Sequence, residues 1–134
     1  MSTPPTDTKT VLVVDDDPSL RLVLAEVLAQ EGYAVVQAPD GQVGLRLAEC
    51  LAPDVILLDL ALPGKSGLDV LEELKGRQAT RAIPVIVMSA YAHLLRKSDM
   101  RYAAGVLQKP FDLRELLGQV QRAAWKSSFR RSSN

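Results

Sequence analysis

The stretch DVILLDLALPGKSGLDVL, residues 54–71, places a fully apolar run directly before an acidic residue. The run from Val55 to Leu58 has no polar side chain, which predicts a short strand buried on both faces. The strand ends at Asp59. Pro63 and Gly64 then favour a turn, and the leucines beyond the turn have the spacing of a helix facing a core. One strand, one turn and one helix in this order are typical of a parallel sheet.

The same alternation of apolar run and helical stripe occurs five times along the chain. The other predicted strands are 11–14, 34–38, 84–88 and 106–108, and the other predicted helices follow them at 18–31, 43–52, 91–104 and 113–124. Cys50 and Trp125 are expected to pack against the core. Five such units predict an α/β fold with right-handed crossovers and helices on both faces of the sheet.

Composition limits the classes of protein to be considered. With 134 residues, the chain is long enough for one domain with a substantial core, which we place at 10–126 between flexible segments at 1–9 and 127–134. The formal net charge is +0, from 16 basic and 16 acidic residues, so nothing favours direct binding to nucleic acid. No apolar stretch reaches the roughly 20 residues of a membrane span, and no signal-peptide core is present. We therefore expect a cytoplasmic protein without membrane insertion.

Chemically active side chains stand where the predicted strands stop. Asp15 and Asp16 follow the first strand, Asp59 ends the third, Ser89 ends the fourth and Lys109 follows the fifth. The carboxyl ends of parallel strands share one edge of the sheet, which is where ligands bind in open α/β folds. With the flavodoxin-like strand order 2-1-3-4-5, the three carboxylates would meet there. Crowded carboxylates repel each other and favour a hard cation such as Mg²⁺.

The hydroxyl and the amine complete a site suited to a phosphoryl group. A metal ion and an ammonium group can stabilise the charge on its oxygens while a carboxylate attacks as nucleophile. The residues alone therefore indicate phosphoryl transfer chemistry at this edge.

Four motifs together resemble the CheY-like receiver domain of two-component response regulators. They are VLVVDDDPSLR at 11–21, DVILLDLALPGKSGLDVL at 54–71, VIVMSA at 85–90 and KPF at 109–111. The resemblance extends from Thr10 to Trp125 and implies a flavodoxin-like fold of five strands and five helices.

The resemblance also implies a role for each acidic residue. Asp59 would accept a phosphoryl group from a phosphohistidine of a sensor histidine kinase or a histidine phosphotransfer protein. Asp16 and Asp59 would bind Mg²⁺ directly, together with the backbone carbonyl of Ala61. Asp15 would act mainly through water.

Further implications concern the switch that follows phosphorylation. Ser89 would be the hydroxyl that moves to hold the phosphoryl oxygens, and Lys109 would pair with the same group, its bond to Pro110 often being cis in this family. Acyl phosphate would shift the face formed by the fourth helix, the fifth strand and the fifth helix, and a downstream protein effector would bind that face. Catalysis would be limited to the domain's own phosphorylation and dephosphorylation. The protein would be a monomer or weak dimer.

Two features depart from the family pattern. Val106 stands where the family usually carries a tyrosine or phenylalanine that swings inward with the switch hydroxyl. The segment between Ser89 and Lys109 is also shorter than usual, so the fourth helix is expected to be short or displaced. Both departures concern the signalling face and leave the acidic residues in place.

Two other functions fit part of the pattern. VLVVDDDPS also resembles the first motif of haloacid-dehalogenase-type phosphatases, with Asp15 as nucleophile and Asp17 as acid. That reading leaves Asp59 unused and lacks a later acidic pair, because Asp112 and Glu115 are better explained by helix capping. The other alternative is a receiver-like interaction module that works without phosphate.

Overall fold

The structure, a computed structural model, describes residues 8–132, with side chains described through residue 126. The parts of the predicted terminal segments at 1–7 and 133–134 lie outside the described residues. Five strands alternate with helices along the chain. The strands are β1 (Thr10–Val14), β2 (Ala34–Ala38), β3 (Val55–Asp59), β4 (Val85–Ser89) and β5 (Gly105–Gln108). The helices are α1 (Pro18–Gln30), α2 (Gly41–Leu51), α3 (Gly67–Gly76), the 3-10 turn η1 (Ala92–Leu94), α4 (Lys97–Met100) and α5 (Leu113–Ser132).

All five strands run parallel in one sheet with the order β2-β1-β3-β4-β5. The predicted flavodoxin-like α/β fold is therefore confirmed. In the register, Val14 pairs with Leu58 and Asp59 pairs with Met88. This pairing brings the carboxyl ends of β1, β3 and β4 to one edge, where the strand-end residues of the sequence gather.

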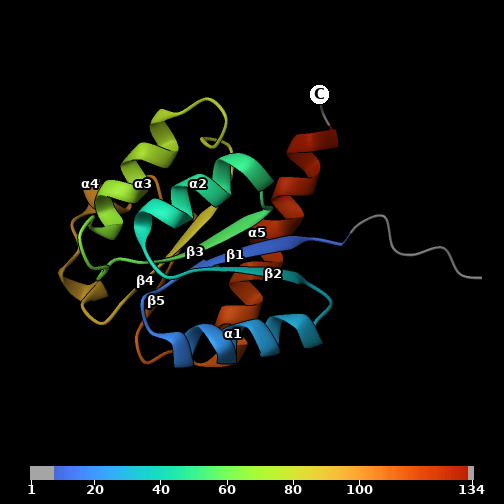
Figure 1. The fold of residues 1–134 in the computed structure, drawn as a ribbon, viewed down its shortest axis with the longest axis horizontal. Helices are drawn as coiled ribbons and strands as arrows, with labels where there is room; N and C mark the ends of the chain where they lie inside the picture. The colour runs from blue at the N-terminus through green and yellow to red at the C-terminus, as the bar shows by residue number, and fades with distance from the viewer. Residues whose placement is uncertain (1–7, 133–134) are drawn as a thin grey trace, which may run out of the picture.

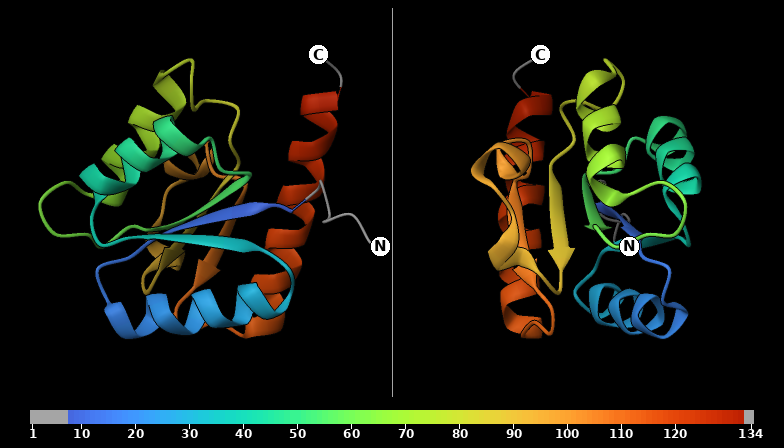
Figure 2. Two further views of the ribbon diagram at one scale, coloured as in Figure 1. Left: turned by 45° about the vertical axis from the view of Figure 1, so that its right-hand side comes forward. Right: turned by 90° about the vertical axis from the view of Figure 1, so that its left-hand side faces the viewer.

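Helices cover both faces of the sheet (Figures 1 and 2). On one face, leucines of α1 and α5 pack on Val11, Val13 and Leu57. On the other face, α2 and α3 pack on alternate residues of the same strands, including Leu12 and Leu58. A fully buried leucine contributes about 1.5–3 kcal/mol of hydrophobic stabilisation. Because β1, β3 and β4 are buried on both sides, their polar residues are confined to the strand ends.

Short polar side chains fix where the helices begin. Asp17 caps α1, because its carboxylate accepts hydrogen bonds from the backbone N–H groups of Ser19 (3.0 Å) and Leu20 (3.4 Å). Asp40 caps α2 through the N–H of Val43 (2.9 Å). These bonds satisfy N–H groups that have no partner inside the helix.

The predicted helix over 91–104 is wrong, although the expectation of a short fourth helix holds. The segment forms η1 and then α4, which spans only Lys97–Met100. Leu95 and Arg96 between them are extended. The carboxylate of Asp99 accepts a hydrogen bond from the N–H of Arg96 (3.2 Å), which starts a new helix at that point.

Three other expectations need correction. Helix α5 continues to Ser132, past the point at 126 where we expected the folded part to end. Cys50 is exposed. Trp125 is 64% exposed and does not anchor α5 on the sheet.

No helix within residues 8–132 combines the length and apolar content that a membrane crossing requires.

Helix α2 approaches β1 so closely at Gly44 that a methyl group has no room. A Cβ atom there would lie 2.9 and 3.1 Å from the two Cγ atoms of Val14, so rotating the valine gives no relief. We expect Gly44→Ala to destabilise the protein by about 1–2 kcal/mol, because overpacking exceeds the gain in helix propensity.

The matched control is Gly76→Ala in α3, where nothing lies within 4 Å of the added Cβ. This change should be neutral or stabilise the protein by up to about 1 kcal/mol. Urea unfolding of both variants measures the difference. Equal effects of the two substitutions would contradict the close packing of α2 on β1.

Candidate functional site

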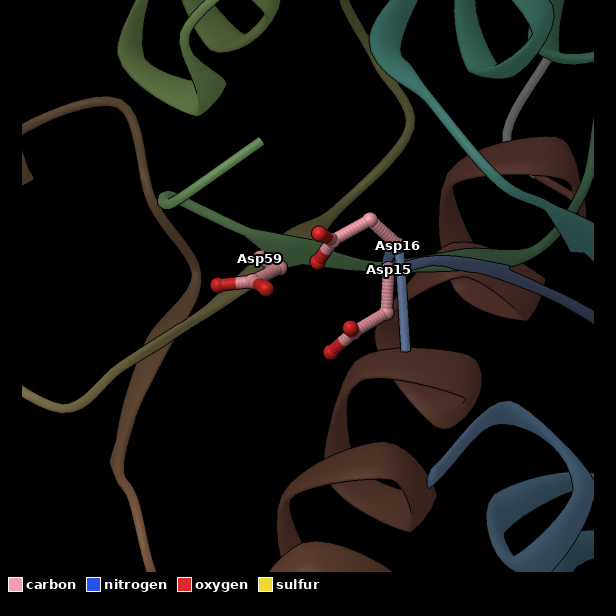
Figure 3. A group of neighbouring side chains, drawn as sticks. All are labelled: Asp15, Asp16 and Asp59. Carbon is pink, nitrogen blue, oxygen red and sulfur yellow. The ribbon is translucent and has the colours of Figure 1, made fainter. Parts of the chain in front are cut away.

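Three carboxylates converge at the carboxyl ends of β1 and β3 (Figure 3). Asp15 and Asp16 directly follow β1, and Asp59 is the last residue of the neighbouring β3. One ligand oxygen from each of the three lies within 4.8 Å of the other two. The sequence analysis expected these residues to meet, and the structure brings them together.

The three acidic residues differ in burial. Asp15 is 0% exposed and Asp59 is 3% exposed, whereas Asp16 lies at the surface. Within residues 8–126, the carboxylate of Asp16 has no hydrogen-bond donor. Two buried acids and one exposed acid therefore surround a space that is open to solvent on the Asp16 side.

Backbone N–H groups orient the two buried carboxylates. Oδ1 of Asp15 accepts a hydrogen bond from the N–H of Asp17 (2.9 Å). Oδ1 of Asp59 accepts one from the N–H of Ala61 (3.1 Å). Each acid thus has one oxygen bound to the turn that follows its strand. The second oxygen of each remains available for another partner.

That partner is Lys109, which follows β5. Its Nζ lies 2.9 Å from Oδ2 of Asp15 and 3.2 Å from Oδ2 of Asp59. The backbone N–H of Lys109 donates to the carbonyl of Ser89 (2.8 Å), which anchors the lysine beside the end of β4. Its bond to Pro110 is cis. The amine therefore bridges acids from two strands that are not adjacent to its own.

Ser89 lies at the same edge, as the last residue of β4. It is 7% exposed, and its Oγ accepts a hydrogen bond from the N–H of Tyr91 (3.0 Å). A hydroxyl in this bond still has its proton to donate. The structure thus gathers all the predicted side chains, Asp15, Asp16, Asp59, Ser89 and Lys109, at one edge of the sheet.

Burial and charge together raise the pKa values of two neighbouring groups of the site, Asp59 and Lys109. Burial raises the pKa of Asp59, and the charge of Asp15 raises it further, which outweighs the lowering by the Ala61 N–H and by Lys109. Burial alone would lower the pKa of Lys109, but the hydrogen bond and charge of Asp15, together with Asp59, raise it overall. The site therefore holds a firmly protonated amine beside an acid whose ionised form is disfavoured.

Two further residues shape the site, and sequence reasoning did not assign either of them a role. Arg21 of α1 donates from Nη1 to the backbone carbonyl of Asp15 (2.6 Å) and so holds the turn that carries two of the acids. Gly67 begins α3, and a Cβ there would collide with the backbone carbonyl of Asp59 and with Leu60. Both residues lie inside motifs quoted above, but only the folded chain gives them these contacts.

The donor set suits a small divalent cation. Mg²⁺ prefers oxygen ligands, binds through one or two carboxylates and keeps several waters. Asp16 offers an exposed carboxylate, and the backbone of Ala61 already lies beside Asp59 through its N–H. Carboxylate repulsion of this kind is relieved when a cation binds. The residues present therefore fit a magnesium ion.

Comparison with known proteins agrees with this geometry. A family model described as the response regulator receiver domain matches residues 11–121. The sporulation initiation phosphotransferase F of Bacillus subtilis is 35% identical over 114 residues, which cover 84% of this chain and 90% of that protein. The transcriptional regulatory protein PdtaR of Mycobacterium tuberculosis is 33% identical over 116 residues, which cover 84% of this chain. The chain spans 55% of the length of PdtaR.

A solved structure with bound magnesium is also similar. The response regulator protein TrrA of Thermotoga maritima, in complex with Mg(2+)-BeF, has a TM-score of 0.80 and 32% sequence identity. The match covers 87% of this chain and 99% of that one.

The electrostatics of Asp59 predict that its charge destabilises the fold. Because its pKa is raised above the ordinary value of 3.8, the folded state binds more protons than the unfolded state, and stability falls as pH rises through the folded pKa. We expect Asp59→Asn to stabilise the protein by about 1 kcal/mol at neutral pH, a typical size for one substitution. The gain should shrink towards acidic pH.

Urea unfolding in the presence of a chelator, measured from acidic to neutral pH, tests this expectation. Asp69→Asn, at an exposed position in the first turn of α3, serves as control and should not stabilise the protein. A loss of stability for Asp59→Asn at neutral pH would show that its attraction to Lys109 outweighs burial and repulsion.

Proposed function

The chain belongs to the response regulator receiver domain family, and on that premise we propose that it is a signalling switch controlled by phosphorylation of Asp59. One observation carries the proposal. The buried carboxylate of Asp59 shares the amine of Lys109 with Asp15 and has an oxygen within 4.8 Å of oxygens of both neighbouring acids. An acid in this position can act as nucleophile between a cation site and a fixed positive charge.

The phosphoryl donor is a phosphohistidine of a sensor histidine kinase or a histidine phosphotransfer protein. A carboxylate oxygen of Asp59 attacks phosphorus, a P–O bond forms, and the P–N bond to the histidine breaks. The electron pair of that bond stays on the imidazole nitrogen, which takes up a proton from solvent. The product is an acyl phosphate on Asp59, and its hydrolysis by water returns the free acid.

Magnesium binding involves the acidic residues around the acceptor. Receiver domains bind Mg²⁺ at an acidic pocket, and in this chain we assign Asp16, Asp59 and the carbonyl of Ala61 as direct ligands, with Asp15 acting through water. When bound, the ion neutralises charge on the phosphoryl oxygens and on the carboxylates. The exposed, unbonded carboxylate of Asp16 supports its place in this set.

Lys109 and Ser89 act on the phosphorylated state. Lys109 already contacts Oδ2 of Asp59 (3.2 Å), so a phosphoryl group on the acid would be within the reach of its amine. Ser89, on the neighbouring strand, would donate its hydroxyl proton to a phosphoryl oxygen. Both contacts exist only after transfer and so favour a second arrangement of the loop after β4.

The output of the switch is a change at the face formed by α4, β5 and α5, which controls a downstream protein effector. The unit that performs this function is the receiver domain, placed at 10–126 with α5 continuing to Ser132, as a monomer or weak dimer. The short α4 and Val106 make this face unusual, because no aromatic ring at 106 can report the state of Ser89. The signal therefore depends on the backbone of the β4 to β5 segment.

The phosphatase alternative is disfavoured by the capping contacts of Asp17. It requires Asp17 as a general acid, but the carboxylate of Asp17 is engaged in capping α1 through Ser19 and Leu20. It also gives no role to Asp59, the acid that Lys109 contacts. Turnover of a generic phosphate ester that is lost with Asp15→Asn but persists with Asp59→Asn would revive it.

Intact mass spectrometry tests the acceptor directly. Incubation with Mg²⁺ and a small phosphodonor such as acetyl phosphate should add one phosphoryl group to the protein. The adduct should be absent from Asp59→Asn and present in Asp69→Asn, which carries the same change at an exposed position outside the site. Without the nucleophilic carboxylate, no acyl phosphate can form.

Two results would contradict the assignment. An adduct that persists in Asp59→Asn would place the acceptor elsewhere. No adduct on the unaltered protein with any donor would favour the receiver-like interaction module that works without phosphate.

Magnesium should stabilise the folded protein through the same carboxylates. A ligand at about 100 times its Kd stabilises by about 2.7 kcal/mol, so thermal unfolding should move to higher temperature when Mg²⁺ is added. We expect Asp16→Asn to abolish most of this shift. Asp17→Asn is the matched control, because asparagine also caps helices well and the residue lies outside the proposed ligand set. Equal loss of the shift in both variants would argue against Asp16 as a ligand.

A further inference from the structure

A groove rich in basic side chains lies at the end of the sheet opposite to the acidic site. It encloses about 480 Å³ between the chain that enters β4, the segment 101–105 before β5, and α5. Its lining includes four basic residues and no acidic one. We name it the basic groove and define it by Lys75, Arg101, Tyr102, Gln119, Arg122 and Lys126.

The positive charge of the basic groove stands out against a chain of zero net charge. Some basic side chains elsewhere are paired with acids, such as Lys65 with Glu73 (2.5 Å) and Arg77 with Glu49 (2.5 Å). Within residues 8–126, no carboxylate forms an ion pair with Arg101, Arg122 or Lys126. Cations gathered without counter-charges raise the local potential and favour a negatively charged partner.

One wall of the basic groove is a single face of α5. Gln119, Arg122, Ala123 and Lys126 have the spacing i, i+3, i+4 and i+7, which aligns them on one side of a helix. Ala123 is buried and small, so it leaves space between the two cations that flank it. The result is a hollow with positive groups along its edge.

The opposite wall carries an arginine that is already held in place. Nη2 of Arg101 donates to the hydroxyl of Tyr102 (2.7 Å), and the guanidinium carbon lies 4.6 Å from the centre of the same ring. Holding the guanidinium in advance lowers the entropy lost when a carboxylate binds it. The tyrosine is 43% exposed, so its ring still offers apolar surface to a partner.

Side chains that bond to the backbone hold α5 and the chain that enters β4 in position around the basic groove. Nζ of Lys75 donates to the carbonyls of Arg81 (3.2 Å) and Ile83 (2.6 Å), which ties the end of α3 to the chain that enters β4. Nε2 of Gln119 donates to the carbonyl of Val106 (3.1 Å) and ties α5 to β5. The basic groove is therefore formed before any partner binds, as is usual for binding sites.

We propose that the basic groove binds an acidic segment of a protein partner. Carboxylates of that segment pair with Arg101, Arg122 and Lys126, and an apolar side chain packs on Tyr102. A nucleic acid fits less well, because its binding relies on neutralising many phosphates along an extended basic surface. Identifying the acidic segment as part of the downstream effector rests on the function proposed above, whereas the affinity of the basic groove for acidic peptide does not.

Fluorescence anisotropy with a labelled acidic peptide tests the proposal. The peptide consists of glutamate, aspartate and leucine residues and one phenylalanine. The peptide should bind the protein saturably, and more weakly at about 200 mM than at about 50 mM salt because added ions screen the charges. The double variant Arg122→Glu with Lys126→Glu should weaken binding by about tenfold or more, a change of about 1.4 kcal/mol or more.

The matched control is Arg46→Glu with Arg114→Glu, which changes the net charge equally at two exposed positions outside the basic groove. It should leave the affinity within about twofold, since only long-range screened interactions change. Circular dichroism confirms that both double variants are folded. An equal loss of affinity in the control, or no saturable binding by the unaltered protein, would overturn the proposal.

Two further measurements separate this proposal from the others. A single-stranded oligonucleotide of matched charge that displaces the peptide and binds more tightly would identify a nucleic-acid site and overturn the acidic-segment proposal. Phosphorylation of Asp59 by the small donor should be unchanged in Arg122→Glu with Lys126→Glu. If the control double variant lost peptide binding but was still phosphorylated, the basic-groove proposal alone would be refuted. If the unaltered protein formed no phosphoryl adduct, the phosphorylation proposal alone would be refuted.

Discussion

Repulsion among the carboxylates at the edge of the sheet is partly offset in this protein by the amine of Lys109. Asp15 and Asp59 are almost fully buried, and Lys109 contacts one oxygen of each. Two buried negative charges this close are costly unless a positive charge or a cation compensates them. The raised pKa of Asp59, caused first by burial, shows that the compensation is incomplete. A site in this condition favours any ligand that brings a cation, which is the property a magnesium-dependent phosphoryl acceptor requires.

The fold brings these repelling charges together because its strands have no other place for polar side chains. Helices bury both faces of β1, β3 and β4, as the two core clusters show. Parallel connections also return every strand end to the same edge. Neighbouring strands β1 and β3 therefore deliver their acids side by side, while β5, two strands away from β3, delivers the amine from a loop. The stability of the core and the charge repulsion at the site therefore follow from the same topology.

The sequence predicts the parts of this arrangement that depend on local pattern. Apolar runs such as Val55–Leu58 identify the strands, and the residue after each run identifies the acids. Tertiary contacts such as the bond from Arg21 to the carbonyl of Asp15 have no local signal, because the partners meet only in the folded chain. The segment 91–104 was mispredicted as one helix, since the extended Leu95 and Arg96 lie within a run that contains no proline or glycine. The continuation of α5 to Ser132 was missed because its last residues lack an apolar stripe.

Strand β5 connects the two regions to which we assign function. Lys109 follows its carboxyl end and contacts the acids, while Gly105 at its amino end lines the basic groove. Between them, the carbonyl of Val106 accepts a hydrogen bond from Gln119, whose helix carries two of the groove cations. Val106 has no ring that could rotate between two positions, so we propose that a change at Lys109 reaches the carbonyl of Val106 through a shift of the strand itself. A displacement of β5 would move the carbonyl that holds Gln119 and, with it, the wall of the basic groove. With valine at position 106, we propose that coupling between the acidic site and the basic groove depends on the backbone of the edge strand β5 and not on a side-chain rotamer.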